Sequence, residues 1–138
     1  MDPLSITGSS FAIAGAIAKA SISILEFSHQ AKEASEDLQG VSRELQALAV
    51  ILDPLTRNIS RAPKGTVTKE LSEQLEASLD GCALVVSRID STIHKYQKDG
   101  GWTRTKWVLF GRGDMEKLRG SLEAYKMALS LGLQFVSM

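Results

Sequence analysis

The chain has 138 residues, 43% of them hydrophobic, which is enough for one domain with a sizeable core. Sixteen basic and sixteen acidic side chains cancel, so no overall field draws the whole protein to nucleic acid or to an anionic surface, and electrostatic targeting has to be local. The single cysteine, Cys82, cannot form an internal disulfide, which argues against a small secreted scaffold and predicts a cytoplasmic protein.

The first predicted helix covers residues 4–25 and is almost free of charge, with Lys19 as its one ionisable side chain. On a helical wheel its docking stripe, the side that can pack on other helices, consists of Ile6, Ile13, Ile17, Ala20, Ile24 and Phe27. Leu4, Phe11 and Ile22 lie nearly opposite that stripe. One flank carries a row of small residues, Gly8, Ala12, Ala16 and Ala20, which allows close helix packing. A helix that is apolar on all sides is either enclosed by protein or in contact with lipid.

The composition of this segment disfavours both a signal peptide and a permanent membrane span. Its start carries Asp2 and lacks a basic n-region. The large apolar residues of this segment favour membrane insertion by roughly 4 kcal/mol. Lys19 opposes insertion by about 3 kcal/mol, and the serines and threonines oppose it further. Insertion is therefore close to neutral, which predicts a segment that is soluble in one context, as the central helix of a bundle, and membrane-bound in another. The side chains expected to enter the membrane are Leu4, Ile6, Phe11, Ile13, Ile17, Ile22 and Leu25.

Three further stretches repeat apolar residues three and four positions apart, the spacing of one helix face. The first stripe consists of Leu38, Val41, Leu45, Leu48, Leu52 and Leu55. The second follows the loop RAPKGT and consists of Leu71, Leu75, Leu79, Cys82, Val86, Ile89, Ile93 and Tyr96. The third consists of Met115, Leu118, Leu122, Tyr125, Leu129, Leu133 and Val136.

Local signals set the expected helix boundaries. Ser35 is the predicted N-cap of the second helix, Pro54 is expected to kink or end it unless the apolar stripe continues through Leu55, and Asp114 is the predicted N-cap of the last helix. The sequence offers no strand candidate of any length, and the loops are short enough for antiparallel neighbours. We therefore predict an all-α protein, an antiparallel four-helix bundle in which residues 1–138 form one domain with a mainly apolar N-terminal helix.

One loop, expected over residues 95–113, combines basic and aromatic side chains. Cations interleaved with indole rings suit a membrane interface with anionic lipid, and they also suit single-stranded nucleic acid. Alternatively, Trp107, Leu109 and Phe110 fold back and close one end of the bundle while the charges stay solvated. In the lipid interpretation the headgroup contacts are Lys95, Lys98, Arg104, Lys106, Trp102 and Trp107.

Residues with catalytic or metal-binding potential are sparse. His29 and His94 are far apart in sequence, with no cysteine or carboxylate cluster at ligand spacing beside them, and no glycine-rich phosphate loop is present. Cys82 falls on the apolar stripe of its helix, which predicts a buried small hydrophobe rather than a nucleophile. We therefore expect no enzyme activity, no metal and no cofactor.

Three stretches carry a family resemblance: MDPLSITGSSFAIAGAIAKA, LQGVSRELQALAVILDPL and KWVLFGRGDMEKLRGSLEAYKMALSLGLQ. In this order they resemble, over nearly the whole chain, the HeLo-like family, the N-terminal domains of fungal NOD-like receptors and related cell-death proteins. The resemblance implies a helical bundle that executes programmed cell death in fungal innate immunity and heterokaryon incompatibility. Its shape and role are similar to those of the bundle of the necroptosis pseudokinase and of plant resistance-protein coiled-coil domains.

The resemblance also implies a mechanism, in which the domain self-associates and its N-terminal helix, here residues 4–25, permeabilises the plasma membrane. Lys19 departs from this picture, because it has to snorkel, pair or face a pore lumen if the helix spans the bilayer. The implied partners are further copies of the chain, anionic membrane lipids and a C-terminal sensor or amyloid-type trigger region, but not nucleic acid. Two alternatives stay open: a homotypic interaction or adaptor domain of the same receptors that never touches lipid, and a nucleic-acid-binding bundle that uses the basic loop.

Overall fold

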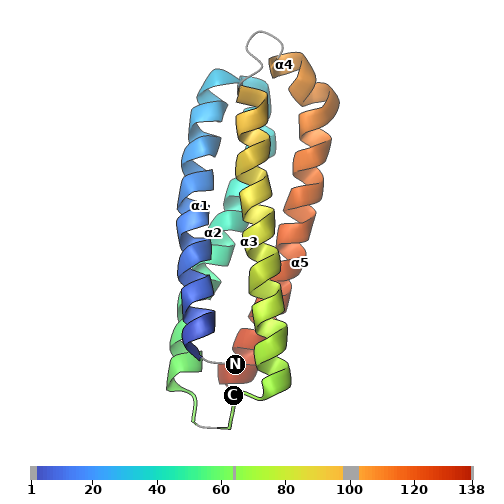
Figure 1. Cartoon of the computed structure of the whole chain (residues 1–138). Helices are drawn as coiled ribbons and strands as arrows, with labels where there is room; N and C mark the ends of the chain where they lie inside the picture. The colour runs from blue at the N-terminus through green and yellow to red at the C-terminus, as the bar shows by residue number, and fades with distance from the viewer. Residues whose placement is uncertain (1–2, 64, 98–102, 138) are drawn as a thin grey trace.

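Four long helices form an elongated bundle (Figure 1). They are α1 (Pro3–Gln30), α2 (Lys32–Arg61), α3 (Lys69–Gln97) and α5 (Arg112–Ser137). Before α5 lie two short elements, α4 (Thr103–Lys106) and η2, a turn of π-helix (Trp107–Gly111). The structure is a computed structural model that describes residues 3–63, 65–97 and 103–137, without the side chains at 3–5, 33, 103 and 104. Over these residues the predicted all-α antiparallel four-helix bundle is confirmed.

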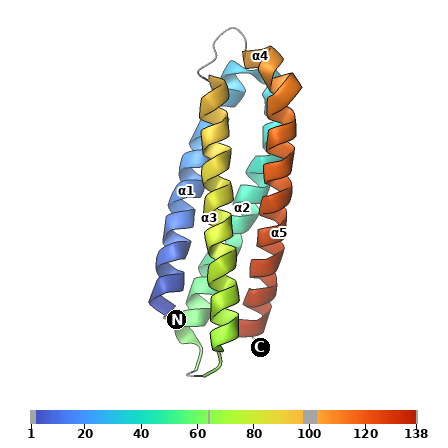
Figure 2. The same ribbon diagram turned by 45° about the vertical axis from the view of Figure 1, so that its right-hand side comes forward.

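The helices pair as two antiparallel hairpins, one formed by α1 and α2 and the other by α3 and α5. α1 packs against α2 and α3, and α5 packs against the same two helices, so α1 and α5 lie diagonally opposite each other, as do α2 and α3. Figure 2 shows α3 between α1 and α5, with α2 behind them. The connection between α2 and α3 therefore joins diagonal helices, whereas its short length led us to expect packed neighbours.

The four predicted apolar stripes point into the bundle. All of their members are buried except Leu71, Leu118, Tyr125 and Leu133, which are partly buried against the same core. On the flank of this core, Lys126 of α5 and Glu44 of α2 form an ion pair at 2.8 Å. The period of the apolar residues thus identifies the inward face of each helix.

The predicted N-cap of α2, Ser35, is wrong, because the helix already begins at Lys32. The chain turns at Ala31, whose N–H donates to the Phe27 carbonyl at 2.8 Å and whose carbonyl accepts from the Ala34 N–H at 3.1 Å. Ala31 and Ala34 are buried. Burial of small side chains in a tight turn therefore takes the place of a side-chain cap.

The expected loop over residues 95–113 and the N-cap at Asp114 are also corrected. A helical run starts at Thr103 and passes through η2 into α5, so Asp114 lies within a helical turn. Its carboxylate instead accepts a hydrogen bond from the Tyr96 hydroxyl of α3 at 3.3 Å. Pro54 does not end α2, which continues to Arg61, because a proline removes only one hydrogen bond of the helix and neighbouring packing can compensate for it.

Candidate functional site

α1 has two apolar faces, of which the bundle covers one. Its docking stripe is buried against α2 and α3, whereas Phe11, Ile22 and Leu25 on the outside are each more than half exposed. The opposite placement of Phe11 and Ile22 is therefore confirmed, while the side chain of Leu4 lies outside the described residues. By length and composition the stretch Ile6–Gln30 could cross a membrane, and only 39% of its apolar window is buried. The core helix of a soluble protein or a signal sequence can have the same length and composition.

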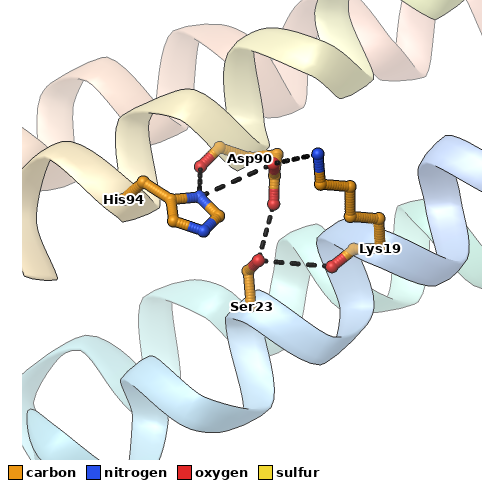
Figure 3. A network of polar contacts seen from close by, with 4 residues as sticks. All are labelled: Lys19, Ser23, Asp90 and His94. Atoms are coloured by element: carbon orange, nitrogen blue, oxygen red, sulfur yellow. Dashed lines mark hydrogen bonds and ion pairs between the residues drawn. The ribbon is translucent and has the colours of Figure 1, made fainter.

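Asp90 of α3 is the centre of a polar contact between α1 and α3 (Figure 3). The buried Ser23 hydroxyl of α1 donates to Asp90 Oδ1 at 2.6 Å. Lys19 Nζ lies 3.9 Å from Asp90 Oδ2, and the Lys19 side chain is 75% exposed while that of Asp90 is 14% exposed. In the folded bundle Lys19 is therefore paired with Asp90.

His94 lies one turn beyond Asp90 on α3 and faces the same carboxylate. Its Nδ1 is 2.8 Å from the Asp90 backbone carbonyl oxygen and 3.5 Å from Asp90 Oδ2. Since both neighbours are acceptors, Nδ1 carries the hydrogen. We refer to the four residues Lys19, Ser23, Asp90 and His94 as the Asp90 cluster.

The Asp90 cluster contains the residue types of a hydrolase triad but not its arrangement. In a triad the imidazole lies between the hydroxyl and the carboxylate and accepts the hydroxyl proton. Here the carboxylate lies in the middle, and the Ser23 hydroxyl donates to Asp90 rather than to His94. The arrangement can hold two helices together, but it does not prepare a nucleophile.

The sequence analysis did not identify Asp90, although two signals pointed to it. Asp90 follows the core residue Ile89, which places it at the edge of the buried stripe of α3. Lys19, the one charged side chain within residues 4–25, is favoured beside an acidic residue of a neighbouring helix if this segment packs in a bundle. Which carboxylate meets Lys19 depends on the axial offset between α1 and α3, which the sequence does not specify.

Trp107 is buried at the end of the bundle, so its assignment as a lipid-headgroup residue is wrong for the folded domain. Its ring makes edge-to-face contacts with Phe27, at 5.2 Å between centroids, and with Tyr96, at 5.6 Å. Its indole N–H donates to Asp37 Oδ2 of α2 at 2.9 Å, and Arg112 Nε donates to the same oxygen at 3.0 Å. The ring therefore contacts α1, α2 and α3, and Asp37 links it to Arg112 at the start of α5. It is unavailable for stacking on a base or a headgroup.

The alternative, in which Trp107, Leu109 and Phe110 all close the bundle, holds only for Trp107, because Leu109 and Phe110 are exposed. Of the predicted headgroup contacts, Lys95 and Lys106 are exposed and line one hollow. The remaining three, Lys98, Trp102 and the side chain of Arg104, lie outside the described residues.

A family model described as the N-terminal region of the pigment biosynthesis cluster protein PigL matches residues 1–138. The chain belongs to this family. PigL N-terminal domains are HeLo-like domains, so the resemblance carried by the three sequence stretches is confirmed over the whole chain. No curated protein and no solved structure matches it.

Metal-binding geometry does not occur in the part of this HeLo-like domain that the structure describes. No group of three or more His, Cys, Asp or Glu side chains there could hold a metal ion. Cys82 is fully buried on α3, and this burial raises the pKa of its thiol from 9.0 to about 12. Because the thiolate is the reactive form, a buried thiol with a raised pKa is a poor nucleophile.

We expect Cys82 to react slowly with a bulky maleimide in the native domain and rapidly in denaturant. Raising the pH from about 7 to about 9 should accelerate labelling in both states, but the native rate should stay far below the unfolded one, because a thiol with a pKa near 12 is almost entirely protonated even at pH 9. Quenched time points read by mass spectrometry measure both rates. Rapid native labelling would contradict burial and reopen a redox role for Cys82.

Proposed function

We propose that this HeLo-like domain is a non-enzymatic effector of programmed cell death that self-associates and permeabilises membranes through α1. The observation that carries the proposal is the exposed apolar face of α1, formed by Phe11, Ile22 and Leu25. A helix that serves only as a core element has no need for large apolar side chains on its solvent side. Here they extend the apolar surface around a helix that is long enough to span a bilayer.

The proposal requires α1 to leave the bundle. Three of the residues expected to enter the membrane, Ile6, Ile13 and Ile17, are buried in the folded domain and reach lipid only after release. Release also separates Lys19 from Asp90, so that Lys19 then snorkels to the interface or faces a pore lumen. The cytoplasmic domain would move to the plasma membrane when a C-terminal sensor or amyloid-type trigger region drives self-association.

The test is dye release from vesicles by a variant in which Phe11, Ile22 and Leu25 are all replaced by serine. We expect its thermal midpoint to stay close to that of the parent, because exposed substitutions cost within about 0.5 kcal/mol each. Leakage should be lost, because each hydroxyl would have to enter hydrocarbon. The matched control replaces the exposed apolar residues Val50 of α2 and Leu84 of α3 by serine and should leak like the parent.

A Phe11, Ile22, Leu25 variant that leaks like the parent would show that α1 is not the membrane-active element. A parent domain that self-associates on vesicles yet releases no dye under any lipid composition would equally contradict the proposal. In either case the adaptor interpretation replaces it.

The adaptor interpretation has an observation of its own. Met127, Leu131 and Phe135 repeat every fourth residue along α5 and are exposed, and the last two line a hollow between α3 and α5. A stripe of this spacing suits contact with another helix. Self-association of the domain without lipid, measured by light scattering and lost on replacing Leu131 and Phe135 by serine, would support this second function.

A further inference from the structure

The end of the bundle formed by η2 carries three consecutive exposed apolar side chains, Val108, Leu109 and Phe110. In Figures 1 and 2 this end lies opposite the two termini, next to the C-terminal ends of α1 and α3. Isolated exposed apolar residues are ordinary, but adjacent large ones mark an interaction surface. We call Val108, Leu109 and Phe110 the apolar tip.

The two residues that flank the apolar tip, Trp107 and Gly111, are buried and fix its position. Trp107 precedes it and is fixed by its hydrogen bond to Asp37 and by two aromatic contacts. Gly111 follows it and is buried against the same indole, where an added Cβ would lie only 2.5 Å from Trp107 Cε3. The π-turn is therefore anchored at both ends while its three middle side chains face solvent. Single turns of π-helix within a helical run are frequent at functional sites.

Lysines surround the apolar tip. Lys95 of α3, Lys106 of α4 and Lys117 of α5 are exposed and line the same hollow as Leu109 and Phe110. The acidic residue in that lining is Asp114, whose carboxylate accepts a hydrogen bond from Tyr96. Among the described residues that line this hollow, positive charge therefore predominates, although the chain as a whole is neutral.

From this combination we infer that the η2 end of the bundle docks on anionic phospholipid bilayers, with Leu109 and Phe110 entering the headgroup boundary and Lys95, Lys106 and Lys117 contacting lipid phosphates and carboxylates. Apolar side chains at the boundary and cations in the headgroup layer are the two contributions that hold peripheral proteins on such membranes. Trp107 serves as the rigid base of this surface, which replaces its predicted role as a headgroup contact. The inference rests on the proposed membrane function and adds a docking surface separate from the outer face of α1.

Docking through this end would bring one end of α1 to the bilayer. Phe27, near the end of α1, packs against Trp107 directly beneath the apolar tip. The domain would then stand on the membrane with the C-terminal end of α1 nearest the lipid. Binding through the tip and leakage through α1 are consequently separable steps.

The experiment is co-sedimentation with phosphatidylcholine vesicles prepared with and without phosphatidylserine. Replacing Leu109 and Phe110 by serine should lower partition onto phosphatidylserine vesicles by about ten-fold, since two apolar contacts are lost. The matched control replaces Val50 and Leu84 by serine, two large apolar residues on the sides of the bundle at similar exposure (73% and 53%, against 66% and 62% at the tip). The control should bind like the parent.

A second variant tests the charges. Replacing Lys95, Lys106 and Lys117 by glutamine should weaken binding to phosphatidylserine vesicles by about five-fold per lysine at low salt, and less at high salt. Because all three side chains are exposed, this variant keeps the fold and decides the question even if the Leu109, Phe110 variant unfolds.

The outcomes separate docking from leakage. A Phe11, Ile22, Leu25 variant that binds vesicles but no longer leaks, together with a tip variant that loses both, supports both assignments. Vesicle binding and self-association without leakage by the parent would support the docking surface and contradict the proposed function. The docking inference is overturned if the tip and lysine variants bind vesicles like the parent. It is also overturned if they lose only oligonucleotide binding, which would make this a nucleic-acid surface, or only self-association, which would make it a contact between copies.

Discussion

Replacing Trp107 by alanine is expected to destabilise the domain by about 3–5 kcal/mol, the range for removing a large buried aromatic side chain. The ring is fully buried, and its contacts with Phe27 and Tyr96 would be replaced by a cavity. The Asp37 carboxylate would in addition lose its indole donor, leaving only Arg112 on that oxygen. Denaturant unfolding followed by circular dichroism at the helix band measures the loss.

The matched variant is Trp107→Phe, which keeps an aromatic ring between Phe27 and Tyr96 but cannot donate to Asp37. It should cost less, about 1–3 kcal/mol, from the smaller ring and the lost hydrogen bond. An unchanged unfolding midpoint for Trp107→Ala would mean that the ring is not enclosed, and the headgroup role predicted from sequence would then return.

The helices and their inward faces were predictable because they depend on short-range periodicity. Leu38, Leu45 and Leu52 recur every seven residues, and at 3.6 residues per turn only one side of a helix can hold them. All three are buried in the structure. The same helical periodicity places Phe11 and Ile22 on the outer side of α1. No tertiary information is needed for either result.

The sequence could not decide between a headgroup role and a buried position for Trp107, because the burial of this ring depends on a long-range contact. Within its own stretch, Trp107 stands among lysines and arginines, which is typical of an interface residue. Its burial depends on an acceptor for the indole N–H, and that acceptor, Asp37, lies 70 residues away in the chain. Once Trp107 is fixed, the following three residues have to turn outward, so Leu109 and Phe110 become exposed instead of buried.

The predicted caps failed for a related reason. Ser35 and Asp114 have the right chemistry for N-caps, but each is already inside a helix. The helices start earlier because buried contacts at Ala31 and Trp107 favour helical backbone upstream of the polar residue. Capping preferences are worth about 1 kcal/mol, which burial of the Trp107 side chain easily exceeds.

The second large effect is expected at Asp90, the centre of the contact between α1 and α3. Asp90→Ala removes the acceptor of the Ser23 hydroxyl and the partner of Lys19 and His94. We expect a loss on the order of 2 kcal/mol, because Ser23 is buried and keeps only the Lys19 carbonyl, at 3.2 Å, as an acceptor. Since the lost contacts join α1 to α3, amide hydrogen exchange should accelerate in α1 more than in α2 or α5.

The control is Asp80→Ala, which removes an exposed carboxylate from the same helix and should leave α1 exchange unchanged. In vesicle assays Asp90→Ala should release dye faster than the parent if departure of α1 limits permeabilisation. Unaltered exchange in α1 would show that the contact does not restrain the helix, whatever happens to leakage.

Asp90→Asn separates charge from hydrogen bonding at the same position. Asparagine keeps an oxygen that can accept from Ser23 but removes the negative charge facing Lys19 and His94. The Lys19 ion pair is long, at 3.9 Å, and its ammonium is largely exposed, so solvent screening leaves it worth about 0–1 kcal/mol. The buried hydroxyl should therefore contribute more than the ion pair, and Asp90→Asn should retain most of the stability that Asp90→Ala loses. If Asn and Ala are equally damaging, the charge holds α1 in place, and Lys19→Gln should then accelerate α1 exchange to the same extent.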